Sequence, residues 1–195
     1  MELFEAIAAR HSYRGKYADT PVPRAHLRQI MEAGLAAPSG CNKQTTFLVG
    51  VDDPALLRDL LDIMDPPTCD TAPAAILVLT KRRIAYTDGN GRPRCYAVQD
   101  YAAAIENMLL AVTALGYASC WIEGHITDAD EQGRRMAERL ALPDEYDLIC
   151  ILPVGRPLDA PKLPRKRDFE QRACFNGWDP APWTPLSAPQ QQSES

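Results

Sequence analysis

Hydrophobic residues recur at intervals of three and four over five stretches of the chain, a spacing typical of helices that bury one side. In the longest stretch Tyr101, Ile105 and Met108 share one stripe, and Leu109 widens it, so this helix should be largely buried. Pro38 stops the helix before the first strand. The predicted helices cover residues 2–9, 24–36, 54–64, 96–115 and 128–142.

Continuous apolar runs between these helices predict strands. The run AAILVLT at 74–80 has the look of a strand covered on both faces. Three further strands are expected at 46–51, 118–124 and 148–155, with a turn at 88–93. Strands interleaved with helices predict an α+β fold (an α/β sandwich), in which helices flank a central mixed sheet.

Length and composition favour a single domain over residues 1–183, followed by a polar tail at 184–195 that has little to bury and should be disordered. Of the 195 residues, 46% are hydrophobic and the net charge is -5, which argues against general binding to nucleic acids or anionic membranes. No apolar run approaches the roughly 18 residues of a membrane span, and the first residues lack the apolar core of a signal peptide. A cytoplasmic location is therefore expected.

Cysteine and histidine give no sign of a metal site. The six cysteines contain no Cys-x-x-Cys pair, and none of the three histidines is spaced with other ligands as zinc requires. Free thiols are the expectation, with Cys120 and Cys150 buried as small apolar side chains.

Two clusters of basic residues could bind an anion. In RHSYRGKY at 10–17, Arg10, Ser12 and Arg14 alternate along an extended segment and can point the same way, as a phosphate group would require. Favourable interaction of cations with the end of the preceding helix is the simpler alternative. The second cluster, PKLPRKR at 161–167, is either a further anion contact or a stiff, solvated loop.

Two loops carry other polar side chains. The segment APSGCNKQ at 37–44 holds amides, a hydroxyl and a thiol in a turn. The run WIEG ends a predicted strand, where α/β sheets usually bind ligands, so Glu123 is either an acid or base or the cap of the next element. No G-x-G-x-x-G or Walker loop is present in the sequence, so a phosphate would have to be bound by side chains.

Together these segments resemble the FMN-dependent nitroreductase family. The matching elements occur in the family's order: RHSYRGKY, APSGCNKQ, AAILVLT, AAIENMLLAVTALGYASCWIEG and LPVGRP with a following basic run, over about residues 2–170. The usual aromatic residue after the amide-containing loop is absent, because Gln44 is followed by two threonines. That departure bears on substrate preference more than on flavin binding.

The resemblance implies a set of contacts to FMN. It places one group of residues at the phosphate and ribityl chain, a second in a loop that lines the flavin from the other subunit, and a third near the reactive nitrogen. A basic run closes on the phosphate, and Cys41 matches no required position. The implied residues are, in the same order, Arg10, His11, Ser12 and Arg14; Pro38, Ser39, Gly40, Asn42 and Gln44; Glu123 and Gly124; and Arg165, Lys166 and Arg167.

The resemblance also implies the reaction. A nicotinamide (NADH or NADPH) would pass hydride to FMN, and a nitroaromatic, quinone or enone would then take it in a ping-pong cycle. It further implies a homodimer with FMN at the subunit boundary. Residues 175–183, which are rich in Trp and Pro, are a candidate arm around the partner. The alternatives are a flavin-dependent dehydrogenase or dehalogenase, and a flavin-binding protein without turnover of its own.

Overall fold

The computed structural model describes residues 1–64, 69–81, 83–124, 126, 131–160 and 162–182. The chain divides into two compact units, Met1–Lys162 and Leu163–Ser195. The first unit contains every α-helix and β-strand of the described residues, and the second contains a short 3-10 helix, η2 (Phe169–Gln171). Residues 184–195, the predicted tail, lie outside the described residues.

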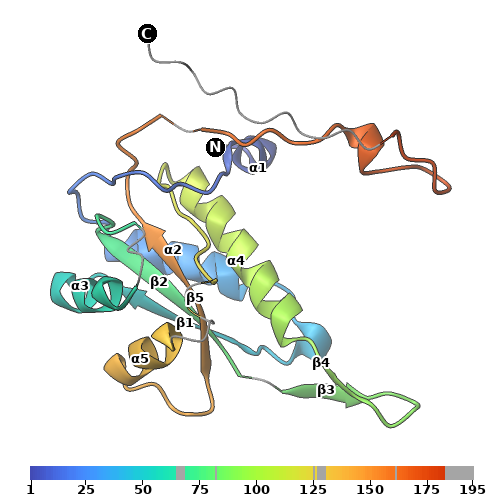
Figure 1. Cartoon of the computed structure of the whole chain (residues 1–195), viewed down its shortest axis with the longest axis horizontal. Helices are drawn as coiled ribbons and strands as arrows, with labels where there is room; N and C mark the ends of the chain where they lie inside the picture. The colour runs from blue at the N-terminus through green and yellow to red at the C-terminus, as the bar shows by residue number, and fades with distance from the viewer. Residues whose placement is uncertain (65–68, 82, 125, 127–130, 161, 183–195) are drawn as a thin grey trace. The chain divides into compact units, whose positions relative to one another are not determined.

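Five α-helices form in the first unit, close to where the hydrophobic spacing predicts them (Figure 1). The third begins where Pro54 occupies its first turn and the Asp53 carboxylate accepts a hydrogen bond from the Leu56 N–H at 2.7 Å, two features that favour a helix start. Residues 128–130 of the fifth predicted helix lie outside the described residues. The helices are α1 (Leu3–Ala9), α2 (Arg24–Leu35), α3 (Pro54–Ile63), α4 (Ala97–Ala114) and α5 (Gln132–Arg139).

Three strands form the central sheet in the order β1-β2-β5, with both pairings antiparallel. They are β1 (Thr46–Val51), β2 (Ala74–Thr80) and β5 (Asp147–Val154). All seven residues of β2 are buried, as its uninterrupted apolar sequence predicts. The α+β prediction is confirmed, and the described residues contain one parallel pairing, the isolated bridge between Ser12 and Ser119.

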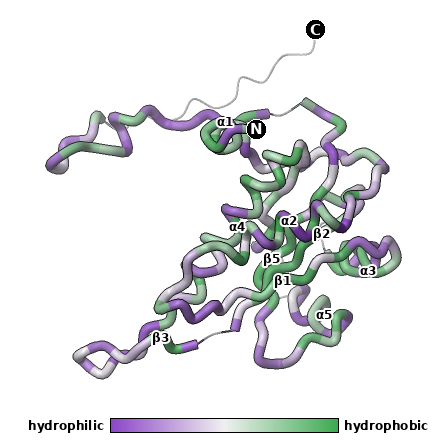
Figure 2. The backbone as a smooth tube through the Cα atoms, turned by 180° about the vertical axis from the view of Figure 1, so that it is seen from behind, coloured by the Kyte–Doolittle hydropathy of each residue, from purple (hydrophilic) through white to green (hydrophobic). Residues whose placement is uncertain are grey.

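The sheet separates two hydrophobic cores, because successive side chains of a strand point to opposite faces. From β2, Leu77 and Leu79 join the core shared with α3 and α5, whereas Ile76 and Val78 join the core shared with α2 and α4. Figure 2 shows the strands as a hydrophobic band among helices that are only partly apolar. Full burial of each such aliphatic side chain stabilises the fold by about 1.5–3 kcal/mol.

The prediction of a strand at 118–124 is wrong, because this segment makes only isolated bridges. Ala118 pairs with Gly155 and Ile122 pairs with Ile151, in one antiparallel register. The pair that would lie between them sets Cys120 opposite Pro153. Proline has no N–H to donate, so the ladder is interrupted there.

A hairpin of two short strands, β3 (Ile84–Thr87) and β4 (Pro93–Cys95), was not predicted from the sequence, which indicated only the turn between them. Its residues are mostly exposed and carry no alternating apolar pattern. The hairpin connects β2 to α4.

Candidate functional site

The segment that follows α1 runs extended beside residue 119. Ser12 forms a parallel bridge with Ser119, and the Tyr13 N–H donates to the Ser119 carbonyl oxygen at 2.9 Å. Side chains alternate in an extended segment, so Tyr13 is buried at 4% exposure, while Ser12 and Arg14 face outward. The predicted alternation of Ser12 and Arg14 on one side is therefore present.

Tyr13 links this segment to the chain that follows β5. Its hydroxyl donates to the carbonyl oxygen of Lys16 at 2.5 Å and accepts from the N–H groups of Leu158 and Asp159 at 3.2 and 3.3 Å. One buried oxygen thus contacts three backbone groups from two segments distant in sequence, and the Leu158 N–H also donates to the Lys16 carbonyl oxygen at 3.0 Å. This arrangement fixes the backbone around Arg14.

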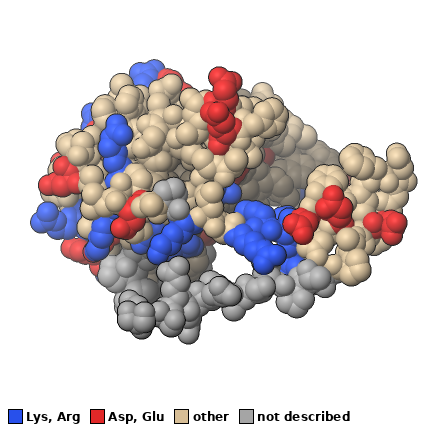
Figure 3. All heavy atoms as spheres, turned by 90° about the horizontal axis from the view of Figure 1, so that it is seen from above, with Lys and Arg blue, Asp and Glu red and all other residues tan. Residues whose placement is uncertain are grey.

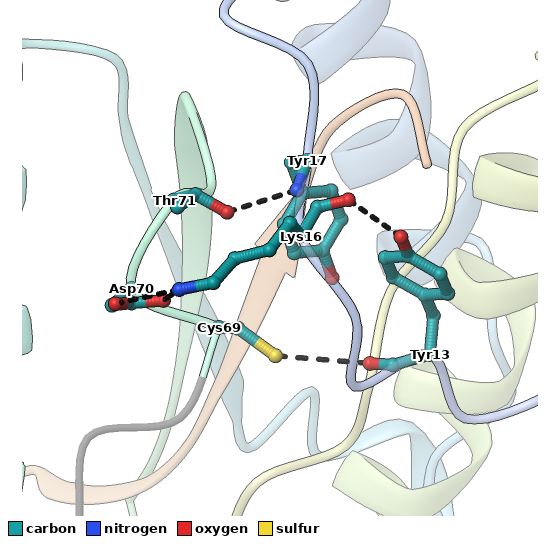
Figure 4. A network of polar contacts seen from close by, with 6 residues as sticks. All are labelled: Tyr13, Lys16, Tyr17, Cys69, Asp70 and Thr71. Carbon is teal, nitrogen blue, oxygen red and sulfur yellow. Dashed lines mark hydrogen bonds and ion pairs between the residues drawn. The ribbon is translucent and has the colours of Figure 1, made fainter. Parts of the chain in front are cut away.

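A second set of contacts attaches the same segment to residues 69–71 (Figure 4). The Lys16 ammonium lies 2.9 and 3.1 Å from the two carboxylate oxygens of Asp70, and the Tyr17 N–H donates to Thr71 Oγ1 at 2.8 Å. The Cys69 thiol contacts the Tyr13 carbonyl oxygen at 3.7 Å. Burial raises the pKa of Cys69 to about 11, so this thiol keeps its proton at neutral pH.

The segment that follows α1 and the chain that follows β5 line a cleft of about 740 Å³ in the first unit. Arg14 and Lys162 are exposed cations at its wall, and the described residues provide neither with a carboxylate partner within ion-pair distance. The Ser12 hydroxyl adds a donor, and Asp159 is the single carboxylate in the lining. The cleft is lined by His11, Ser12, Tyr13, Arg14, Gly15, Asp159, Ala160 and Lys162.

Two buried polar atoms beside these residues lack a partner among the described residues. They are Nε2 of His11 and Oγ of Ser119. The other ring nitrogen of His11 contacts the Ala9 carbonyl oxygen at 2.9 Å, which favours a proton on Nδ1 and leaves Nε2 as an acceptor. Buried polar groups without partners are uncommon, but both atoms are inaccessible to solvent, so they do not by themselves indicate a ligand. The exposed cations and the Ser12 hydroxyl of the cleft fit a phosphorylated ligand such as FMN.

Arg10 occupies a different position from its neighbours in sequence. Its guanidinium lies 3.2 Å from a carboxylate oxygen of Glu106 on α4, and it does not line the cleft. Its predicted contact with a phosphate stays a prediction.

Figure 3 shows several Lys and Arg side chains exposed on the face seen from above in Figure 1.

The loop that contains Gly40 is attached to the first turn of α4. The carboxylate of Asp100, 5% exposed, accepts from the Gly40 N–H at 2.7 Å and from the Thr45 hydroxyl at 2.8 Å. Gly40 begins a short 3-10 helix, η1 (Gly40–Asn42), and a side chain on it would overlap the ring of Tyr96. The absence of a side chain therefore lets the loop pack against Tyr96.

Three non-glycine residues of this loop have positive φ: Cys41 (52°), Asn42 (52°) and Gln44 (49°). Such conformations are unfavourable for residues with side chains and occur preferentially at functional sites. The Gln44 N–H donates to Ser39 Oγ at 3.0 Å, and the two amide side chains meet at 3.3 Å. Pro38, Asn42 and Gln44 are exposed. Hydrogen bonds of its backbone N–H groups therefore hold the loop in place, and the amide side chains of Asn42 and Gln44 face outward.

The side chain of Glu123 is half-buried and oriented by two neighbours. One oxygen accepts from the Trp121 indole N–H at 2.8 Å, and the other contacts the Tyr101 hydroxyl at 3.4 Å. Next to it, a Cβ placed on Gly124 would meet no atom within 4 Å, so the backbone there borders open space. A carboxylate with both oxygens occupied is better suited to orient groups than to exchange protons.

The long helix α4 joins three of the predicted segments. Asp100 binds the loop at Gly40, Tyr101 contacts Glu123, and Glu106 pairs with Arg10. The remaining predicted residues, Arg165, Lys166 and Arg167, belong to the second unit, where the first two are exposed. Their role stays a prediction.

Three residues of the site were not identified from the sequence. Lys162 lies in the basic run at 161–167, in which the family resemblance implies a role only for residues 165–167. Asp100 is a carboxylate on an otherwise apolar helix face, a signal that could have revealed it. Tyr13 resembles any aromatic residue of a hydrophobic core, and the surrounding sequence does not predict the hydrogen bonds of its hydroxyl.

The described residues contain no group of three His, Cys, Asp or Glu side chains placed to bind a metal ion. Of the helices described, none combines the length and the hydrophobicity that a membrane crossing requires.

The chain resembles known proteins over most of its length. Residues 7–67 and 64–156 match the sequence model of the nitroreductase family. An Archaeoglobus fulgidus protein, provisionally named NADH dehydrogenase/NAD(P)H nitroreductase, is 28% identical over 81% of this chain and 87% of its own length.

Two solved structures extend the likeness to three dimensions. A provisionally named nitroreductase of Desulfovibrio desulfuricans in complex with FMN is 30% identical, with a TM-score of 0.68, over 85% of this chain and 91% of that chain. A Bacteroides fragilis nitroreductase with bound FMN is 28% identical, with a TM-score of 0.71, over 90% of this chain and 98% of that chain. The fold is that of the nitroreductases, and the chain belongs to the nitroreductase family.

Proposed function

We propose that this protein is an NAD(P)H-dependent oxidoreductase that binds FMN. Its nicotinamide and its acceptor would use one site in turn, in a ping-pong cycle. The names of relatives support the class, since one includes NAD(P)H nitroreductase and two structures contain FMN. Quinones, nitroaromatics and enones are the proposed acceptors.

The cleft beside Arg14 is the observation that carries this proposal. A phosphate monoester needs several donors and positive charge in one place, and Ser12, Arg14 and Lys162 offer both. Asp159 opposes them with one negative charge, so the lining keeps a net charge of +1 when His11 is neutral. The Tyr13 hydroxyl would hold the Arg14 backbone in position.

The loop at Pro38–Gln44 and the segment at Glu123 and Gly124 would bind the flavin ring. Bound FMN would supply the chemistry of accepting and donating hydride. The amides of Asn42 and Gln44 would provide directional hydrogen bonds, Glu123 would orient Trp121, and the space beside Gly124 would let the ring approach the backbone. These residues would bind and orient, and no acid or base from the chain is required.

The overall reaction balances without a further co-reactant. A quinone takes up two electrons and two protons to become a hydroquinone, and a nitro group takes up the same number to become a nitroso group and water. The nicotinamide supplies both electrons and one proton as hydride, and solvent supplies the second proton.

We also propose that the protein is a homodimer. In the first unit, Leu3, Phe4 and Ile7 of α1 are 61%, 82% and 48% exposed. They form an apolar face that a partner subunit would bury. In the second unit Phe175 and Trp178 are 81% and 91% exposed, as expected of an arm that packs on a partner. Analytical ultracentrifugation tests this, and a monomer that retains flavin would contradict it. The six free cysteines favour a reducing compartment, and we propose a cytoplasmic location.

Comparison of FMN with riboflavin, which lacks the phosphate, tests the assignment of the cleft. Quenching of flavin fluorescence by the flavin-free protein should give a Kd for FMN at least about tenfold below that for riboflavin, because charged hydrogen bonds add 1.5–3 kcal/mol. Equal affinities would show that the cleft does not bind the phosphate.

A further inference from the structure

The β3–β4 hairpin adjoins the loop that the proposed function places at the flavin. Tyr96, which follows β4, packs its ring where a side chain on Gly40 would lie. The hydroxyl of Tyr86 on β3 lies 3.2 Å from the hydroxyl of Tyr96, and the ring centres are 6.2 Å apart at an interplanar angle of 38°. Two aromatic rings thus extend from the loop along the hairpin.

Tyr86 is 44% exposed, which is high for an aromatic side chain of a folded domain. Packing of the two rings against each other would explain their contact. It does not explain why so much of the Tyr86 side chain remains exposed to solvent.

The charge of the hairpin is the second observation. Arg94 on β4 is the cross-strand partner of Tyr86, and Arg83 and Arg92 lie on the same hairpin. None of the three forms an ion pair with another described residue. The nearby carboxylate, Asp88, instead accepts hydrogen bonds from two N–H groups of the turn, at 2.9 and 3.0 Å.

A positive hairpin is unexpected in a chain of net charge -5. Hydrogen bonding from Tyr96 and then from Arg94 lowers the pKa of Tyr86, which agrees with a guanidinium close to that hydroxyl. The hairpin therefore offers two neighbouring, mutually tilted aromatic rings and, beside them, a guanidinium without a carboxylate partner among the described residues.

We infer that Tyr86, Tyr96 and Arg94 recognise the electron acceptor, and that the preferred acceptor is a planar aromatic molecule carrying a carboxylate or sulfonate. A planar ring can stack on the tyrosines, and the guanidinium fork matches two oxygens of the anionic group. This inference rests on the proposed function, because it needs the loop at Pro38–Gln44 to border the site where the acceptor is reduced.

An anionic and a neutral acceptor with the same nitrophenyl ring test the inference: 4-nitrobenzoate and its methyl ester. The nitro group of the ester is intrinsically the easier to reduce, so affinities are compared between the two compounds and rates are compared between protein variants. The flavin-loaded protein is reduced by light with EDTA in the absence of oxygen and nicotinamide, and reoxidation of the flavin is followed after mixing. Without nicotinamide, an effect of Arg94 on binding NADPH cannot enter the result. Calorimetry with the oxidised protein gives the Kd of each compound independently of turnover.

The carboxylate should bind about fivefold more tightly than the ester, the range expected of a solvent-exposed ion pair. Arg94→Ala should abolish that preference by weakening the binding and slowing the reduction of the carboxylate alone, and Arg94→Lys should restore part of it. Tyr86→Leu should slow both acceptors alike. Arg28→Ala is the matched control, since Arg28 is exposed on α2 and pairs with Glu32.

The outcomes separate the two proposals. If the reduced wild-type protein transfers electrons to neither compound and to no quinone, the proposed function fails. If it reduces a quinone but neither nitrobenzoate, the inference about the hairpin is overturned. If it reduces both, but without a preference or with a preference that Arg94→Ala leaves unchanged, the inference about the hairpin is overturned. Should the variants not fold, the wild-type preference must still shrink in about 0.5 M salt, where exposed charges are screened; a preference that salt does not change contradicts the role of Arg94.

Discussion

The carboxylate of Asp100 on α4 accepts a hydrogen bond at 2.7 Å from the backbone N–H of Gly40, in the loop assigned to the flavin. Its second oxygen accepts from Thr45 at 2.8 Å, just before β1. A charged group at 5% exposure is costly to bury unless its oxygens are satisfied, and here the loop backbone satisfies them. Asp100 therefore couples the shape of the loop to the packing of the helix.

Asp100→Asn should weaken both the fold and flavin binding. An amide retains one acceptor, so either the Gly40 N–H or the Thr45 hydroxyl loses its partner, at a cost of about 1–3 kcal/mol. Urea unfolding and the Kd for FMN measure the two effects. The control Asp62→Asn changes an exposed carboxylate of α3 and should alter neither. If Asp100→Asn raises the Kd for FMN but leaves the free energy of unfolding unchanged, Asp100 acts on the flavin directly rather than through the loop.

Arg14→Ala should raise the Kd for FMN by about tenfold or more and leave that for riboflavin nearly unchanged, because a charged hydrogen bond to phosphate is lost. Arg10→Ala should have a smaller effect, since its guanidinium already pairs with Glu106. Fluorescence titration of both flavins with both variants gives the comparison. If Arg10→Ala raises the Kd for FMN more than Arg14→Ala does, the phosphate binds near α4 and not in the cleft.

Tyr13→Phe removes one hydroxyl that contacts three backbone groups. The Asp159 N–H loses its acceptor, whereas the Leu158 N–H and the Lys16 carbonyl oxygen remain hydrogen-bonded to each other at 3.0 Å. The stability loss should be about 1–3 kcal/mol, and the Kd for FMN should rise with that for riboflavin less affected, since the backbone around Arg14 loses its support. Tyr146→Phe serves as the control, because the described residues supply no hydrogen bond to that hydroxyl. Unchanged FMN affinity in Tyr13→Phe would show that the cleft keeps its shape without the hydroxyl.

Alkaline pH should destabilise the protein partly through Cys69. Its pKa is raised by burial to about 11, whereas an unfolded cysteine titrates near 8.5. As pH rises, the cysteine of the unfolded chain loses its proton at a lower pH than the cysteine of the folded chain. The buried thiol therefore contributes its full stabilisation below about pH 8.5, and this contribution is lost as pH rises toward 11. The melting temperature should therefore fall over this range, and fall less steeply in Cys69→Ala. Identical slopes would mean that other groups, such as Cys120, dominate.

Most of the fold could be predicted from the sequence because its signals are local. The strand at 74–80 is a continuous apolar run, and α4 repeats its apolar residues at helical intervals. The failure at 118–124 has a non-local cause, since an apolar segment forms a strand only if its neighbour can complete the ladder, and Pro153 cannot. The β3–β4 hairpin escaped prediction because it buries too little to leave an apolar pattern.

The site could be predicted only as far as residue types indicate chemistry. Arg14 and Ser12 were identified because cations and hydroxyls suit a phosphate. Whether a cation is available depends on its neighbours, and the pairing of Arg10 with Glu106, almost a hundred residues away, is set by tertiary packing. The roles of Tyr13 and Asp100 likewise depend on the contacts of atoms that the sequence alone does not place.

The absorbance spectrum of the purified protein, recorded before and after anaerobic addition of NADPH or NADH, tests the central claim most directly. The account predicts a yellow protein with a flavin spectrum that reduced nicotinamide bleaches, and whose colour returns on addition of a quinone. A colourless protein that cannot be reconstituted with FMN would contradict it, and a yellow protein that neither nicotinamide bleaches would contradict the proposed reaction.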